Sequence, residues 1–158
     1  MSRPYSPEAG PDLPFIDEHS VSVAAPAGTV WHCLTMHIRR SRLGSAEILA
    51  HGLAAEPRRG SGSSIGEGTT LPGFLVVEAV PDQRIRLTGR HRFSRYALTF
   101  TLAGSANGTL LSARTNAAFP GPQGRIYRAL VISSGVHRIL VRRLLRAVCR
   151  QAERQRGG

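Results

Sequence analysis

The longest periodic pattern in the chain lies near its C-terminal end, between Gly124 and Arg154. Apolar and polar positions repeat there with the 3.6-residue period of an α-helix, which predicts one long helix over this range. One stripe of the helix consists of Ile126, Leu130, Ser133, His137, Val141, Leu144 and Val148. The opposite arc consists of Arg128, Arg138, Arg142, Arg146 and Arg150. Polar side chains within an apolar stripe are unfavourable in a simple core, so we expect the helix to line a cavity.

Six short segments with alternating hydrophobicity come before this helix. They predict strands at residues 53–58, 63–71, 74–80, 84–93, 96–103 and 109–119. The breaks between the later ones are Pro72-Gly73, Pro81-Asp82, Ser94-Arg95 and Asn107-Gly108. Because such links are short, consecutive strands must be antiparallel.

The N-terminal part has a different composition. Residues 1–14 contain four prolines among polar residues and are predicted to be a disordered lead-in. A strand at 15–25 follows, then a helix at 27–38 that opens after Pro26, and a weaker helix at 42–50. Together, these elements predict an α+β fold, in which a seven-stranded antiparallel curved sheet wraps around the long C-terminal helix. Two short helices lie between strands 1 and 2, and residues 155–158 form a frayed tail.

Two segments resemble a known superfamily. SVSVAAPAGTVWHCL contains Val23, Ala25, Pro26, Val30 and Trp31 in a strand-to-helix pattern similar to the opening of SRPBCC proteins (START, polyketide-cyclase and birch-pollen-allergen-like). FLVVEAVPDQRIRLTG resembles the middle hairpin of that superfamily, with Pro81 at the turn. The resemblance implies a single ligand-binding domain at 15–154 with a helix-grip fold, whose apolar cavity lies between the sheet and the C-terminal helix.

Strand periodicity directs several polar side chains toward the same interior. In the segment 84–93, His91 and Phe93 share the apolar face, and Tyr96 shares the inward face of the next strand. The predicted ligand-binding residues are Trp31, His91, Phe93, Tyr96, Leu98, Phe100, Leu130, Ser133, Ser134, His137 and Val141. His91, His137 and Tyr96 are candidate acid–base groups, but a backbone carbonyl or a water molecule at a cavity edge would satisfy them equally.

Three function classes follow from these observations. The leading hypothesis is a binding protein that holds a hydrophobic small molecule, such as a lipid, polyketide or isoprenoid, in the internal cavity. The alternative, implied by the resemblance, is an enzyme of the polyketide cyclase/dehydratase type that uses cavity His and Tyr side chains as acid–base groups. The third is an interaction protein with an exposed apolar patch. The residues leave open whether a reaction is catalysed, and both a monomer and a homodimer are compatible with them.

Composition narrows the range of partners. The net charge of +11 comes from arginine alone, and the arginine rows at 84–92 and 138–150 are interpreted as solvated faces. Weak contact of these faces with an anionic membrane surface is the alternative. No motif indicates specific nucleic-acid binding. Cys33 and Cys149 have no CxxC spacing, and the six histidines lack metal-ligand spacing, so reduced thiols and no metal or other cofactor are predicted. No apolar leader or membrane-length segment occurs, which predicts a cytoplasmic protein.

Overall fold

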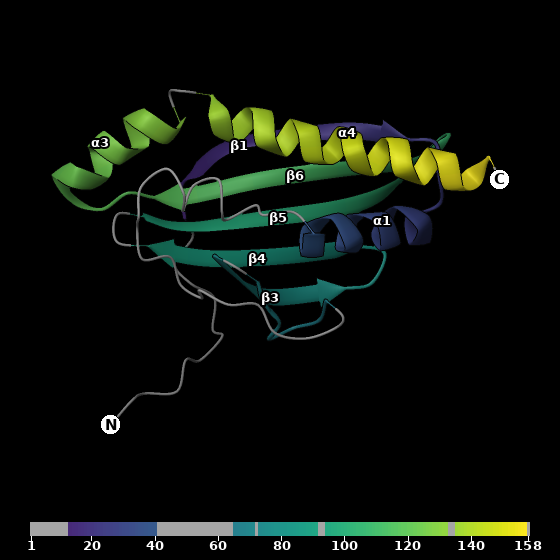
Figure 1. Ribbon diagram of the computed structural model, residues 1–158, viewed down its shortest axis with the longest axis horizontal. Coiled ribbons are helices and arrows are strands. Elements are labelled where there is room, and N and C mark those ends of the chain that lie inside the picture. Colours follow the sequence, from purple (N-terminus) through teal and green to yellow (C-terminus); the bar gives the residue numbers. More distant parts are fainter. Residues whose placement is uncertain (1–12, 41–64, 72, 92–93, 133–134, 158) are drawn as a thin grey trace.

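The computed structural model describes residues 13–40, 65–71, 73–91, 94–132 and 135–157. Six strands and three helices occur in this part of the chain (Figure 1). The strands are β1 (Phe15–Val23), β2 (Thr70–Leu71), β3 (Phe74–Val80), β4 (Arg84–His91), β5 (Ser94–Ser105) and β6 (Gly108–Ala118). The helices are α1 (Ala27–Arg40), α3 (Gly121–Ile132) and α4 (Val136–Arg156).

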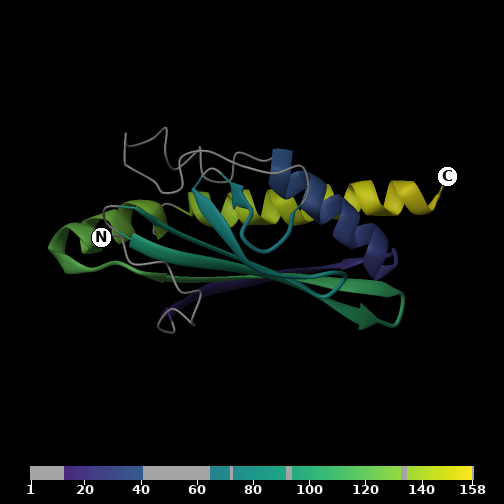
Figure 2. The same cartoon turned by 90° about the horizontal axis from the view of Figure 1, so that it is seen from below.

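The strands form one antiparallel sheet in the order β1-β6-β5-β4-β3-β2. The chain runs as a meander from β2 to β6, and β1 pairs with β6 at the edge. Helices α1 and α4 lie on the same face of the sheet, so the domain has two layers (Figure 2). The core lies between these layers, as the helix-grip prediction requires.

Alternation explains which strand residues reach the core. Along β6, buried and less buried residues alternate over its whole length, because successive side chains point to opposite faces. The helices present their apolar stripes to the same layer. Fully buried core side chains include Val23, Val30, Leu34, Ile85, Leu87, Phe100, Leu111, Val141 and Val148.

The predicted turn at Asn107-Gly108 is present between β5 and β6. Gly108 has φ 151°, and a Cβ there would collide with the Val23 carbonyl oxygen and lie 2.9 Å from the Ala25 nitrogen. Thr109 donates a hydrogen bond from Oγ1 to the Ala25 carbonyl at 2.8 Å. The hairpin is therefore fastened to the segment that joins β1 to α1.

The prediction of one continuous helix from Gly124 to Arg154 is wrong. The chain forms α3 and α4 instead, and Gly135 between them is left-handed with φ 73°. A left-handed residue changes the chain direction, so the helical phase before it does not continue after it. Ile126 and Leu130 consequently leave the predicted inner stripe and are exposed.

The sheet differs from its prediction in number and length of strands. The described part has six strands rather than seven, and its second strand is only Thr70–Leu71 instead of 63–71. The predicted strand at 53–58 and helix at 42–50 lie outside the described residues. Strand β3 has the predicted bounds, and α1 begins at the predicted residue.

The C-terminal half of α4 is held against the end of β1. Glu153 Oε1 accepts a hydrogen bond from the Ala24 backbone nitrogen at 3.1 Å, and Arg156 donates to the Ala24 carbonyl at 2.8 Å. Val148 and Ala152 are fully buried beside these contacts. Helix α4 continues to Arg156, past the predicted end at Arg154. This anchoring fixes the direction in which the first turns of α4 cross the sheet.

Candidate functional site

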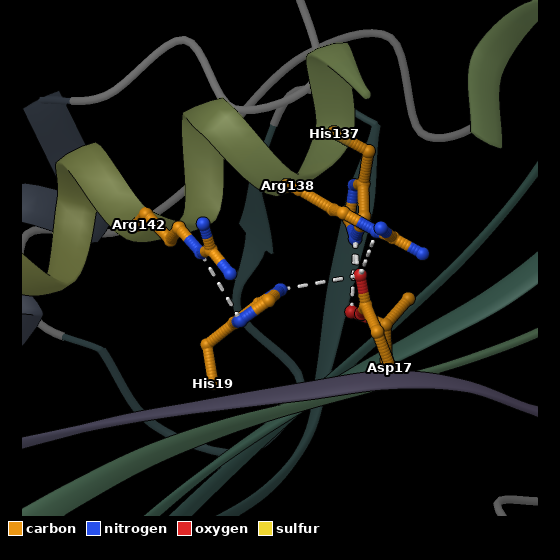
Figure 3. Close-up of polar contacts among 6 residues, drawn as sticks. Asp17, His19, His137, Arg138 and Arg142 are labelled. Atoms are coloured by element: carbon orange, nitrogen blue, oxygen red, sulfur yellow. Dashed lines mark hydrogen bonds and ion pairs between the residues drawn. The ribbon is translucent and has the colours of Figure 1, made fainter. Parts of the chain in front are cut away.

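A group of polar side chains lies between the first turns of α4 and the sheet, where β1 pairs with β6 (Figure 3). This group, called here the Asp17 cluster, consists of Asp17 and His19 of β1, Thr115 of β6, and His137, Arg138 and Arg142 of α4. Asp17 stands opposite Thr115 in the sheet register. His19, two positions further along β1, is on the same inner face.

The centre of the cluster is largely removed from solvent. The side chains of Asp17, His19 and His137 are only 10%, 13% and 17% exposed. Arg138 differs, since its side chain is 57% exposed. Charge interactions among the first three are therefore screened little, whereas solvent weakens the contribution of Arg138.

His19 connects Arg142 to Asp17. Arg142 Nε donates to His19 Nδ1 at 3.4 Å, and His19 Nε2 lies 3.3 Å from Asp17 Oδ2. Because a guanidinium can only donate, His19 Nδ1 must accept, and in the neutral ring the hydrogen is then on Nε2. His19 accordingly donates to the Asp17 carboxylate.

His137 approaches the other oxygen of the same carboxylate. Its Nε2 is 2.9 Å from Thr115 Oγ1 and 3.8 Å from Asp17 Oδ1. Arg138 Nε lies 3.8 Å from Asp17 Oδ2. Asp17 Oδ1 is buried and has no hydrogen-bond partner within the described part of the chain. The cluster thus contains a buried acceptor atom that a hydrogen-bond donor would satisfy.

The protonation of His137 is set by competing effects. Burial lowers the pKa of His137, the Asp17 carboxylate raises it, and His19 and Arg138 lower it further. Burial is the largest of these causes, so the imidazole is neutral at pH 7. A neutral imidazole has one nitrogen that donates and one that accepts a proton.

Two familiar kinds of site do not match this geometry. In a Ser–His–Asp triad the acid and the hydroxyl bind different imidazole nitrogens, whereas Asp17 and Thr115 both face Nε2 of His137. A metal ion between His19 and Asp17 would have to replace the hydrogen on His19 Nε2. The guanidinium groups of Arg138 and Arg142, which lie close by, would repel it. Among the residues that the structure describes, no three His, Cys, Asp or Glu side chains are arranged to hold a metal ion.

Several predicted ligand-binding residues lie in or against the core. Leu98, Phe100 and Val141 are buried, and Trp31 is partly buried and packs against the hydrophobic core. His137 lies one helical turn before Val141, so the Asp17 cluster adjoins the apolar core.

Tyr96 has a backbone partner. Its hydroxyl donates to the Gly73 carbonyl at 2.7 Å, and its ring meets Phe74 edge-on with 5.2 Å between centroids. A Cβ on Gly89 would collide with the Tyr96 ring and the Gly73 carbonyl oxygen. This contact is the one expected for a structural tyrosine at the edge of a core.

Among the remaining predicted residues, Leu130 is the one whose side chain the structure describes. Leu130 lies on α3 and is exposed, because of the helix break at Gly135. Phe93, Ser133 and Ser134 lie outside the described residues. The backbone of His91 pairs with Ser94, while its side chain lies outside the described part.

Sequence reasoning missed Asp17, His19 and Thr115, although alternation in β1 contains the signal. Val21 and Val23 face the core, and the same period of two puts Asp17 and His19 on that face. Arg138 and Arg142, which were predicted on the solvent arc, also reach this group. Long arginine side chains can extend in this way toward a neighbouring face of the helix.

Comparison with known proteins identifies the fold. The sequence matches no protein-family model and no curated protein. Protein MLL2253 of Mesorhizobium loti is 14% identical over 87% of this chain and 96% of its own, with a TM-score of 0.52. A protein of Rhizobium leguminosarum is 13% identical over 87% of this chain and 93% of its own, with a TM-score of 0.54.

A third solved structure comes from a biosynthetic pathway. The di-domain ARO/CYC StfQ of steffimycin biosynthesis is 17% identical, with a TM-score of 0.53. The match covers 93% of this chain and 53% of StfQ, so the chain spans about half of that protein. Identities this low establish the fold alone. The protein therefore shares its fold with these solved structures, StfQ among them, in agreement with the helix-grip fold that the resemblance implies.

Proposed function

We propose that the protein binds a hydrophobic small molecule of the lipid, polyketide or isoprenoid class between its sheet and helices α1 and α4. The fold supports this proposal, because α1 and α4 cover one face of the sheet. The Asp17 cluster lies between α4 and this face, next to the apolar core. StfQ is an ARO/CYC of the steffimycin biosynthetic pathway, and the likeness to it favours a polyketide among the three classes.

The observation that supports binding most directly is that the buried Asp17 Oδ1 has no hydrogen-bond donor among the described residues. A buried acceptor without a hydrogen bond costs about 1–3 kcal/mol, and a hydroxyl group of a ligand would remove that cost. Ala113 stands beside His19 in the sheet and Leu111 beside Val21, which makes the adjoining surface apolar. We infer that the ligand has an apolar body and at least one hydroxyl group that donates to Asp17.

Trp31, the single tryptophan, provides a test because it is partly buried against the core. Its fluorescence would be titrated with emodin, a hydroxylated anthraquinone, and with unsubstituted anthraquinone. We expect saturable quenching by both and about tenfold tighter binding of emodin, the difference of one charge-assisted hydrogen bond. In Asp17→Asn, whose amide oxygen still accepts a hydrogen bond but has no charge, the preference for emodin should decrease. No saturable quenching by either probe, and no small molecule in native mass spectra of the purified protein, would refute the proposal.

His137 favours a second candidate function, that of a polyketide cyclase/dehydratase-type enzyme. A neutral imidazole beside a buried carboxylate can accept a proton from the carbon next to a carbonyl group, and the carboxylate stabilises the resulting imidazolium. The C–H bond breaks, the proton moves to the imidazole, and the electron pair remains as an enolate. Solvent deuterium would then enter a 1,3-diketone faster with the wild type than with His137→Gln. Exchange at the rate of the buffer alone would exclude this candidate and leave the binding proposal intact.

A further inference from the structure

Helix α3 presents apolar side chains to solvent. Ile126 is 64% exposed and Leu130 is 58% exposed. Tyr127 instead faces the body of the protein, with its ring centroid 6.1 Å from that of Phe119. At about 100° per residue, Ile126 and Leu130 lie about 40° apart around the helix, whereas the buried Gly124 and Tyr127 lie on an adjoining side. The exposed face of α3 is thus the one that an amphipathic helix would normally bury.

The position of α3 extends this surface beyond the main body. The helix projects past the end of the sheet and meets the first turns of α4 at an angle (Figures 1 and 2). Ile139, in those first turns, is 52% exposed. The three exposed side chains are therefore all in the α3–α4 corner, defined here as residues 121–132 and 135–143.

Every exposed charged side chain of the corner itself is an arginine. Arg125 and Arg128 of α3 and Arg143 of α4 are exposed. Over residues 83–152 the sequence contains thirteen arginines and no aspartate or glutamate. Exposed apolar side chains flanked by arginines are the pattern of helices that lie in the interface of an anionic bilayer.

We propose that the α3–α4 corner docks on an anionic lipid surface. Ile126 and Leu130 enter the boundary between headgroups and acyl chains, and Arg125 and Arg128 pair with lipid phosphates. No helix in the described part of the chain is long and apolar enough to cross a membrane.

A second copy of the chain fits the same surface less well. A symmetric dimer through α3 would add the arginines of a second copy to this basic region, and no acidic residue between 83 and 152 is available to neutralise them. An anionic bilayer supplies both the apolar environment and the opposite charge.

Vesicle flotation tests the proposal with the intact protein. Wild type should float with vesicles of phosphatidylcholine and phosphatidylglycerol, less so at high salt, and remain unbound with phosphatidylcholine alone. Ile126→Gln combined with Leu130→Gln should lower binding about tenfold or more. Leu110→Gln, which replaces an exposed leucine on the outer sheet face, is the matched control and should bind like wild type.

A second pair of variants separates local charge from net charge. Arg125→Gln with Arg128→Gln should weaken binding about tenfold, whereas Arg90→Gln with Arg95→Gln, on the sheet, should weaken it much less. Circular dichroism would establish that each variant is folded. Equal binding to neutral vesicles, or equal losses in both arginine pairs, would overturn the proposal. So would a dimer, detected by light scattering, that the Ile126 and Leu130 variants dissociate.

Discussion

Acidification below about pH 6.5 should destabilise the folded protein through His137. In the folded state burial lowers the pKa of this imidazole, and in the unfolded chain it returns to the ordinary value of 6.5. Between the lowered and the ordinary pKa, the unfolded state binds more protons than the folded state. The free energy of unfolding is therefore highest above the ordinary pKa and falls as the pH drops toward the folded-state pKa.

The contacts of His137 determine the sign of this pH dependence and set an upper limit on its size. Its side chain is 17% exposed, and Asp17 Oδ1 is 3.8 Å from Nε2, beyond hydrogen-bond distance. A charge-assisted hydrogen bond needs about 2.7–2.9 Å, so Asp17 offsets the cost of burying an imidazolium only in part. His19 and Arg138 oppose the added positive charge. A single group of this kind removes at most about 1.4 kcal/mol of stability per pH unit within the window.

Urea unfolding, followed by Trp31 fluorescence from about pH 7.5 to about pH 5, would measure the effect in wild type and His137→Gln. Glutamine does not titrate and still offers a hydrogen bond to Thr115. We expect wild type to lose stability relative to the variant as the pH falls. Parallel curves would refute the reasoning, and a relative gain by wild type would mean that Asp17 outweighs burial.

Two further comparisons use matched pairs within the sheet. Thr115→Val and Thr109→Val each remove one hydroxyl hydrogen bond from the inner face of β6, so each should lower the free energy of unfolding by about 1–2 kcal/mol. Only Thr115→Val, which alters the surroundings of His137, should also change emodin affinity in the Trp31 assay, and equal effects of both would contradict the placement of the site. Gly89→Ala, which forces a Cβ into the Tyr96 ring, should cost about 1–3 kcal/mol in chemical denaturation. Gly104→Ala in the neighbouring strand has open space around it and should be neutral or slightly stabilising, so similar losses in both would contradict the packing described for Gly89.

The sequence-based prediction was most accurate for elements that begin or end at a proline or at turn-forming residues. Pro26 precedes α1, and Pro81-Asp82 separates β3 from β4, so these boundaries follow from the restricted backbone of proline and from turn residues. The strand bounds at Phe74 and Val80 were predicted correctly for the same reason. Alternation then assigned Leu98 and Phe100 to the core, where they are buried.

The helix break and most of the Asp17 cluster could not be predicted in this way. Periodicity assumes that helical phase is continuous, and an internal glycine costs a helix only about 1 kcal/mol, so Gly135 alone does not announce a break. The cluster depends on where α4 crosses the sheet, which is fixed at its far end by contacts of Glu153 and Arg156 with Ala24. Such long-range contacts leave no local pattern in the sequence.

Gly135 connects the two proposals made for this protein. Its left-handed backbone lets α3 turn away from the core, which exposes Ile126 and Leu130, and lets α4 begin with His137 over Asp17. A continuous helix would have kept Ile126, Leu130 and His137 on one stripe and buried them together. Because α3 contributes nothing to the Asp17 cluster, substitutions at Ile126 and Leu130 should change membrane binding without changing emodin binding. The proposed lipid contacts of Ile126 and Leu130 and the proposed ligand site at Asp17 and His137 are thus close together but depend on different side chains.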